Sequence, residues 1–352
     1  MKLSALLLSL LTVSTVHLRA AQPGVILKEA IFGGSPFGQC HASTIAETKD
    51  GLVAAWFAGT REKHPDVSIW LARKVGTKWS KPVEIDKGIA PNAAGVEVDQ
   101  ACWNPVLFQQ PDGDLTLFYK IGLNPREWWG AYKTSKDGGK TWSHRVRLPK
   151  NIYGPVKNKP VLLKDGTLLC GSSTEDKGWR VHFEWTKDGG QTWNRTAPIN
   201  DGKAVSAIQP SILQLKDGSL MALGRSQQKL IWSSYSRDNG KSWSDLRLID
   251  LPNPSAGTDA VTTRSGKHVL VYNHTGKGRS PLNVSISTDG MVWQATAVLE
   301  HGDGEYSYPA VIETKDGRIH ITYTWRRKQI VHAVLDLAKL PGRQIIQGAW
   351  PR

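Results

Sequence analysis

Two arginines stand after apolar, β-rich runs, where the chain leaves a strand and can present a side chain to a ligand. Arg225 follows the run Leu220–Gly224, and Arg279 lies shortly after the run Val269–Tyr272. A guanidinium group is a planar fork of donors that can bind a carboxylate through two hydrogen bonds at once. Each of these arginines could therefore bind a carboxylate.

Other polar residues in similar positions could move protons or bind hydroxyl groups. His41 lies in an expected strand, and because an imidazole titrates near neutral pH it could transfer a proton. Asn273 and His274 follow the second apolar run and could bind hydroxyl groups. Alternatively, these three side chains belong to the protein core.

Two lysines interrupt a segment that we expect to be a strand facing the centre of the fold. Lys157 and Lys159 follow Gly-Pro-Val, which suggests a cationic wall of the site. Their long apolar stems would equally let both amines reach solvent, so both interpretations stay open. No His and Asp cluster with metal-ligand spacing appears, and we expect neither a metal nor another cofactor.

The elements that must position these residues are predicted by an internal repeat. Four segments share a Ser/Thr-x-Asp pattern that ends in Trp, and their tryptophans fall about 50 residues apart, a spacing typical of propeller blades. In such a turn, Ser and Asp bond backbone amides, glycine adopts positive φ and Trp packs beneath the loop. The segments are 135–142, 186–193, 236–243 and the shortened 287–293, with a degenerate copy at 72–79.

A second series of tight turns alternates with the first. Each is an Asp-Gly or Ser-Gly pair between short β-rich runs, which is the signature of a hairpin. The pairs begin at Asp50, Asp112, Asp165, Asp217, Ser265 and Asp316. Six such turns indicate six blades, and two hairpins per blade give four antiparallel strands each. We therefore predict an all-β fold, a six-bladed β-propeller.

The Ser-x-Asp-x-Gly-x-Thr-Trp pattern resembles the Asp-box, or BNR repeat, of the sialidase superfamily. The resemblance covers nearly all of the chain beyond its N-terminal segment. It implies a glycan-processing site at the mouth of the central channel. Asp-boxes lie at the blade periphery and recur in proteins with unrelated activities, so they identify the fold more than the reaction.

The resemblance also implies roles for individual residues. Sialidase-like enzymes hold a substrate carboxylate with three arginines, use an Asp as acid/base and attack with a Tyr that a Glu activates. On this basis Asp66 is the acid/base, with Arg61 nearby, and Tyr306 is the nucleophile. Arg225 and Arg279 match two of the three arginines.

Three positions depart from that pattern. Gln209 occupies the glutamate position, and a neutral amide cannot act as the base that activates a tyrosine. Glu305 could partly replace it, but neighbouring strand residues point to opposite faces, so it reaches Tyr306 only if the backbone turns there. His41 stands near the position of the first arginine.

Three functions remain open from the sequence. The leading one is an exo-glycosidase, similar to a sialidase, that acts on acidic sugar termini of glycans. A lyase that cleaves uronate-containing glycan by β-elimination needs a carboxylate neutraliser and a base, which Arg or Lys with Tyr306 or His41 could supply. A noncatalytic glycan-binding propeller would use tryptophans to stack on sugar rings.

Composition bounds the partners. The 352 residues carry a formal net charge of +14, but Lys and Arg are scattered without runs of five or more, so we expect no nucleic-acid partner. The positive surface instead favours acidic glycans. Cys40, Cys102 and Cys170 are an odd number, and we expect them to be buried core residues.

The N-terminal segment has the pattern of a secretory signal. Met1 and Lys2 precede an apolar run to Val16 and then small residues, so we expect residues 1–21 to be a signal peptide and the protein to be secreted or periplasmic. No apolar run reaches the ~20 residues of a membrane span, and stable membrane insertion is not expected. Residues 22–352 are predicted to form one propeller domain, as a monomer.

Overall fold

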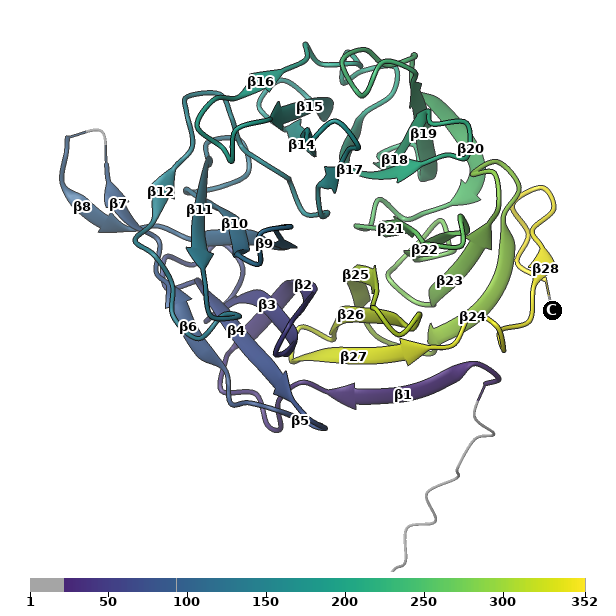
Figure 1. Cartoon of the computed structure of the whole chain (residues 1–352), viewed down its shortest axis with the longest axis horizontal. Helices are drawn as coiled ribbons and strands as arrows, with labels where there is room; N and C mark the ends of the chain where they lie inside the picture. The colour runs from purple at the N-terminus through teal and green to yellow at the C-terminus, as the bar shows by residue number, and fades with distance from the viewer. Residues whose placement is uncertain (1–21, 93, 352) are drawn as a thin grey trace, which may run out of the picture.

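The computed structural model describes residues 22–92 and 94–351, and in this part of the chain the regular secondary structure is entirely β-strand. Six antiparallel sheets surround a central channel (Figure 1). The predicted six-bladed propeller is therefore confirmed. No helix in the described residues is long or apolar enough to cross a membrane. The expected signal peptide, residues 1–21, lies outside the described residues.

The first three blades follow one another along the chain. The first consists of β2 (Gln39–Thr48), β3 (Gly51–Gly59), β4 (Ser68–Val75) and β5 (Lys78–Trp79), with β6 (Val83–Asp86) also paired to β4. The second consists of β9 (Cys102–Gln109), β10 (Leu115–Ile121), β11 (Trp129–Ser135) and β12 (Val146–Arg147). The third consists of β13 (Val161–Leu162), β14 (Leu168–Thr174), β15 (Arg180–Thr186) and β16 (Asn194–Arg195). Between the first two blades, the hairpin of β7 (Ile89–Pro91) and β8 (Glu97–Asp99) projects from the ring (Figure 1).

The last three blades complete the ring. The fourth consists of β17 (Ala207–Gln214), β18 (Leu220–Ser226), β19 (Leu230–Ser236) and β20 (Arg247–Pro252). The fifth consists of β21 (Asp259–Thr262), β22 (His268–Tyr272), β23 (Leu282–Ser287) and β24 (Gln294–Glu300), extended by β28 (Arg343–Gln344). The sixth consists of β25 (Tyr306–Glu313), β26 (Ile319–Trp325), β27 (Gln329–Leu335) and the N-terminal β1 (Val25–Ala30). Because β1 pairs with β27, the two ends of the propeller close within one sheet (Figure 1).

Both series of tight turns lie at the same end of the blades. The Asp-Gly and Ser-Gly turns join the first strand of each blade to the second, and the Asp-boxes join the third to the fourth. In the second blade, Ser135 Oγ accepts from the Gly139 amide at 2.8 Å and Asp137 accepts from Thr141 Oγ1 at 2.6 Å. The side-chain and backbone hydrogen bonds from Thr141 lower the pKa of the Asp137 carboxyl. The connections from second to third strand are left to form the opposite end.

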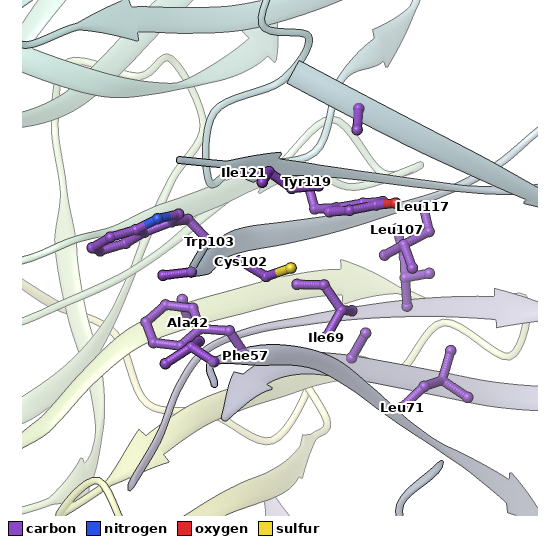
Figure 2. Close-up of a cluster of buried hydrophobic side chains, with 14 of the residues drawn as sticks. Ala42, Phe57, Ile69, Leu71, Cys102, Trp103, Leu107, Leu117, Tyr119 and Ile121 are labelled. Carbon is purple, nitrogen blue, oxygen red and sulfur yellow. The ribbon is translucent and has the colours of Figure 1, made fainter. Parts of the chain in front are cut away.

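The core fills the spaces between neighbouring blades. Figure 2 shows the cluster between the first two blades, where Phe57 and Ile69 face Trp103 and Tyr119 across the interface. Cys102 belongs to this cluster, and Cys40 and Cys170 are likewise buried and unpaired, as expected. The aromatic side chains account for much of the stabilisation of such interfaces, because each ring buries a large apolar area.

A distortion recurs where the chain enters the innermost strand. In five blades a residue other than glycine adopts a left-handed backbone there, and the strand pairing shifts register in four of these blades. Such a bulge turns a side chain away from its regular direction. The five residues are Ala42 (φ 55°), Asn104 (φ 37°), Lys157 (φ 77°), Gln209 (φ 58°) and Tyr308 (φ 52°).

Candidate functional site

A cavity of about 770 Å³ lies where the second-to-third connections of the blades meet. Its volume falls within the range of ligand pockets. All six blades contribute to the wall, from these connections, from the distorted starts of inner strands or, for Arg225, from the end of the second strand β18. Representative wall residues, in blade order, are Glu62, Trp103, Glu175, Arg225, Arg279 and Tyr308.

Tyr308 is the residue around which the charged groups gather. The Cζ atoms of Arg225 and Arg279 lie 5.4 and 5.5 Å from the centre of its ring. Lys157 Nζ lies 5.7 Å from the same centre, and the ring of His41 is 4.2 Å away between centroids. A cation at this distance from an aromatic ring is attracted to it. The site thus contains one phenol surrounded by three cations and an imidazole.

Arg225 has donor capacity left for a ligand. Its Nη1 donates to the Ser255 carbonyl at 2.8 Å, and its guanidinium packs 4.8 Å from the Trp179 ring. Its Nε is buried and has no hydrogen-bond partner among the described residues. Glu175 also lines the cavity; burial raises the pKa of this carboxyl, and the charge of Arg225 only partly offsets that effect. The Glu175 carboxyl therefore keeps its proton to a higher pH than an exposed glutamate does.

Arg279 is held by an acidic neighbour. Its Nη1 donates to Glu305 Oε1 at 2.6 Å, and Glu305 also accepts from Arg327 Nε at 3.2 Å. Burial acts to raise the pKa of Glu305, but the charges of Arg279 and Arg327 and the hydrogen bonds outweigh it, so this pKa lies below its usual value. Glu305 is thus an ionised partner of two arginines and lies behind the cavity wall.

His41 is kept neutral by its surroundings. Its Nδ1 lies 2.9 Å from Thr324 Oγ1, and the side chain is fully buried. Burial is the largest cause that lowers the pKa of this imidazole well below its usual value. The positive charges that add to the effect belong to Arg327, Arg279, Arg225 and Lys157.

Tyr306 does not take the position expected from the sequence. It is packed in the core between the fifth and sixth blades, and its hydroxyl donates to the Asp303 carbonyl at 3.1 Å. Tyr308 faces the cavity instead. The reason is the register shift between Ser307 and Ala310, which together with the left-handed backbone of Tyr308 breaks the regular alternation of the strand.

The loop between β3 and β4 reaches the cavity through other residues than Asp66. Asp66 accepts from Thr60 Oγ1 at 2.6 Å and lies 2.7 Å from His64 Nδ1, so it fastens the base of its own loop. Slight burial acts to raise the pKa of Asp66, but the bonds from Thr60 and His64 lower it overall. Arg61 is exposed, and Glu62 is the loop carboxylate in the wall.

The two lysines lie below the cavity and join blades to one another. Lys157 Nζ donates to the carbonyls of Thr258 and Pro309, at 2.6 and 2.5 Å. Burial lowers its pKa to about 7. Lys159 Nζ pairs with Asp259 Oδ2 at 2.8 Å. Both amines therefore bind protein groups of other blades.

Of the three remaining predicted residues, only Gln209 lines the cavity. Its Oε1 is buried without a hydrogen-bond partner in the described part of the chain. Asn273 Nδ2 donates to the Tyr306 carbonyl at 2.9 Å, and His274 lies between Tyr272 and the Gly348 carbonyl. Asn273 and His274 thus support neighbouring loops and strands.

The sequence matches the family of the BNR repeat-like domain over residues 50–321. The chain belongs to this family. Its predicted membership of the sialidase and BNR-repeat superfamily is thereby confirmed, and the Asp-boxes that carried the resemblance occupy the turns expected of them.

Two curated relatives of this BNR repeat-like protein share 23% sequence identity with it. A sialidase of Paraclostridium sordellii is 23% identical over 239 residues, which cover 54% of this chain and 58% of that protein. An anhydrosialidase of Macrobdella decora is 23% identical over 262 residues, which cover 62% of this chain and 33% of that protein. The BNR repeat-like chain thus matches 58% and 33% of the lengths of these relatives.

Solved structures share the fold at low identity. A protein of unknown function from Dyadobacter fermentans superposes with a TM-score of 0.74 at 17% identity, covering 91% of this chain and 100% of that one. The NanB sialidase of Streptococcus pneumoniae gives a TM-score of 0.71 at 14% identity, covering 89% of this chain and 71% of that one. These likenesses support the propeller architecture of the BNR repeat-like protein.

Three wall residues of this BNR repeat-like protein, Leu123, Trp128 and Tyr308, were missed from the sequence. Trp103 and Trp128 lie 6.0 Å apart in an edge-to-face contact, and Leu123 beside them is 62% exposed. They form an aromatic and apolar wall in the second blade. Tyr308 had a usable signal, because a proline follows the distorted residue in three blades: Asn104-Pro105, Gln209-Pro210 and Tyr308-Pro309.

The arrangement combines anion binding with groups that can move protons. Arg225 and Arg279 offer charged donors, Tyr308 a hydroxyl, His41 a neutral imidazole and Glu175 a carboxyl whose pKa is raised by burial. In the described residues, no three His, Cys, Asp or Glu side chains gather so that they could hold a metal ion. These side chains could supply a nucleophile, a proton acceptor and a proton donor beside a site that binds an anion.

Proposed function

We propose that this protein is a sialidase-type exo-glycosidase that removes carboxylate-bearing sugar termini from glycans. The observation that supports the proposal is the placement of Arg225 and Arg279 at 5.4 and 5.5 Å from the ring of Tyr308, in the wall of one cavity. A sugar carboxylate bound by these arginines would bring the adjacent anomeric carbon near the phenol. Two sialidases among the relatives support the same class of reaction.

The side chains suggest a division of roles in hydrolysis. The Tyr308 oxygen attacks the anomeric carbon while its proton passes to the neutral imidazole of His41. The bond to the leaving oxygen breaks, and this oxygen takes the proton of Glu175, whose raised pKa suits a general acid. Water then cleaves the sugar from Tyr308, returning a proton to Glu175 while His41 returns the phenol proton.

β-Elimination on a uronate is the second candidate. It is favoured by Gln209, which leaves Tyr308 without the glutamate base of the sialidase pattern, and by the neutral imidazole beside the phenol. In this reaction the Tyr308 oxygen, after passing its proton to His41, would take the proton from C5 of the uronate while the arginines neutralise the carboxylate. The C4–O bond would then break, Glu175 would give its proton to the leaving oxygen, and a C4–C5 double bond would remain.

A panel of glycans separates the candidates. The purified protein would be assayed on sialylated and uronate-capped oligosaccharides and on the same uronates as methyl esters, with ultraviolet absorbance reporting an unsaturated uronide. Hydrolysis predicts a free acidic sugar without new absorbance, and elimination predicts the absorbance. Binding of these glycans without any product would instead indicate a noncatalytic glycan-binding propeller.

Arginine variants test the site itself. Arg225→Met and Arg279→Met should raise KM for the acid much more than for its methyl ester, since only the acid carries the charge. Arg326→Met is the matched control, because Arg326 bonds the Asp303 carbonyl and packs on Trp325 outside the cavity wall. Equal effects on acid and ester in all three variants would refute the carboxylate site.

The cellular setting is part of the proposal. We propose that residues 1–21 are removed during export, that the protein acts outside the cytoplasm as a monomer, and that its net charge of +14 draws it to acidic glycans. N-terminal sequencing of exported protein and light scattering would check these points. An uncleaved N-terminus or a stable oligomer would contradict them.

A further inference from the structure

Four side chains form an alternating chain of charges beside the cavity. Arg279 Nη1 pairs with Glu305 Oε1 at 2.6 Å, and Arg327 Nε lies 3.2 Å from the same carboxylate. Arg327 Nη1 then pairs with Glu62 Oε2 at 2.5 Å. The order Arg279, Glu305, Arg327, Glu62 links the fifth blade, the segment between the fifth and sixth blades, the sixth blade and the first blade.

Two of these four side chains lie in the cavity wall, and the other two lie outside it. Arg279 and Glu62 line the wall, whereas Glu305 and Arg327 lie behind it. The side chain of Arg327 is 19% exposed and contacts both carboxylates at once. Any effect of Arg327 on a ligand must therefore pass through Arg279 or through the loop that carries Glu62.

Backbone contacts fix the place of Arg327. It lies in the turn between β26 and β27 with φ 55°, and its carbonyl accepts from the Cys40 amide at 2.9 Å. The adjacent Arg326 amide donates to the Glu305 carbonyl at 2.6 Å. The Tyr306 amide in turn donates to the Arg279 carbonyl at 2.9 Å. These backbone hydrogen bonds thus hold the guanidinium of Arg327 between Glu305 and Glu62.

The charge balance of these four side chains determines how strongly Arg279 can attract an acidic ligand. Glu305 is shared between two guanidinium groups, so it does not neutralise Arg279 alone. Glu62 in turn has Arg327 as its cation, which restrains the loop between β3 and β4. Because Arg has several fixed donors, it can bridge two carboxylates in a way that the single ammonium of Lys cannot reproduce.

We propose that Arg327 is a positioning residue that orients Arg279 through Glu305 and fixes the loop of residues 60–67 through Glu62. The inference rests on the proposed function in that the ligand at Arg279 is a sugar carboxylate. Without Arg327, Glu305 pairs with Arg279 alone and Glu62 loses its cation. An acidic ligand then meets a neutralised arginine and a loosened loop.

Arg327→Met is the test, and Arg326→Met is its matched control. The two residues are neighbours in one turn, both have left-handed backbones, and both substitutions remove one positive charge. Arg326 differs because its side chain contacts the Asp303 carbonyl and Tyr306, away from both carboxylates of the chain. Two readouts apply: KM and kcat on the acidic glycan, and hydrogen exchange of the amides in residues 60–67.

We expect Arg327→Met to raise KM for the acid about tenfold or more, with a smaller change in kcat, and to speed exchange in the loop. Arg326→Met should do neither. Arg327→Lys should restore part of the lost affinity, and Glu62→Gln, which removes the loop partner of Arg327, should speed exchange in residues 60–67. If Arg327→Met fails to fold, these last two variants decide between the outcomes.

Failure of the inference is distinguishable from failure of the proposed function. If the wild type acts on acidic glycans and the variants of Arg327 and Arg326 match in KM and in exchange, Arg327 positions nothing. If the wild type neither binds nor cleaves N-acetylneuraminate-capped or glucuronate-capped oligosaccharides, the proposed function fails. Faster loop exchange in Arg327→Met alone would in that case support the loop contact and overturn the effect on the acidic ligand.

Discussion

The rings of His41 and Tyr308 lie 4.2 Å apart between centroids, with their planes inclined at 45°. His41 comes from the first strand of the first blade and Tyr308 from the first strand of the last blade. Their contact exists because β1 joins the sheet of the sixth blade and closes the ring. An imidazole held neutral beside a phenol can accept its proton, which links closure of the fold to the chemistry we propose.

Replacing the hydroxyl of Tyr308 should separate it from Tyr306. Tyr308→Phe should lower kcat by about 100-fold or more, as expected for loss of a group that takes part in bond making or proton transfer. Tyr306→Phe should leave kcat within about twofold, because its hydroxyl bonds only a loop carbonyl and an arginine outside the cavity wall. Steady-state kinetics on the acidic glycan measures both. A larger decrease in kcat for Tyr306→Phe than for Tyr308→Phe would indicate that Tyr306 is the nucleophile.

The general acid can be identified through the leaving group. Glu175→Gln should slow cleavage of an alkyl glycoside far more than that of a nitrophenyl glycoside, because a good leaving group needs no proton. Glu175 lines the cavity and burial raises its pKa, whereas Asp66 fastens its own loop and has a lowered pKa. Asp66→Asn should therefore slow both substrates to a similar extent. The reverse pattern would assign the acid to Asp66.

His41 should set the acid limb of the pH profile. As a base it works in the neutral form, so activity is lost as the pH falls through its pKa, which burial and four cations hold well below 6.5. Arg327 is the largest charge contribution, so Arg327→Met should raise this pKa and move the acid limb to higher pH. Arg326→Met should leave the limb in place. An unshifted limb in Arg327→Met would show that another group titrates there.

The sequence was sufficient for the fold because its signals are local. A turn such as Asp165-Gly166 or the Asp-box of Ser135 to Trp142 is determined by neighbouring residues, and counting such turns gave the number of blades. The choice between Tyr306 and Tyr308 depends on a register shift against β26, which strand alternation cannot anticipate. Arg327 was missed for another reason. Its partner Glu62 lies in the first blade and its partner Glu305 lies before the sixth blade, and only closure of the ring brings both carboxylates to Arg327.

The seam that closes the ring should be sensitive to acid. His320 Nδ1 lies 2.9 Å from His332 Nε2, and His332 Nδ1 lies 2.9 Å from Glu29 on β1. Burial and the charge of His332 lower the pKa of His320 to about 4, and burial also lowers the pKa of His332. Since unfolded histidines bind protons from about pH 6.5 downward, the unfolded chain gains protons first, and stability falls as the pH drops from about 6.5 to about 4.

This loss should amount to up to about 3 kcal/mol from His320 alone, at 1.36 kcal/mol for each pKa unit. Urea unfolding at about pH 7 and about pH 5 would measure about 2 kcal/mol of this loss as a difference in the free energy of unfolding, because the rest develops between about pH 5 and about pH 4. His320→Gln removes one of the titrating histidines and should reduce the slope, whereas His144→Gln, at an exposed position, should keep the wild-type slope. Equal slopes for wild type and His320→Gln would show that the acid sensitivity arises away from the seam between β1 and β27.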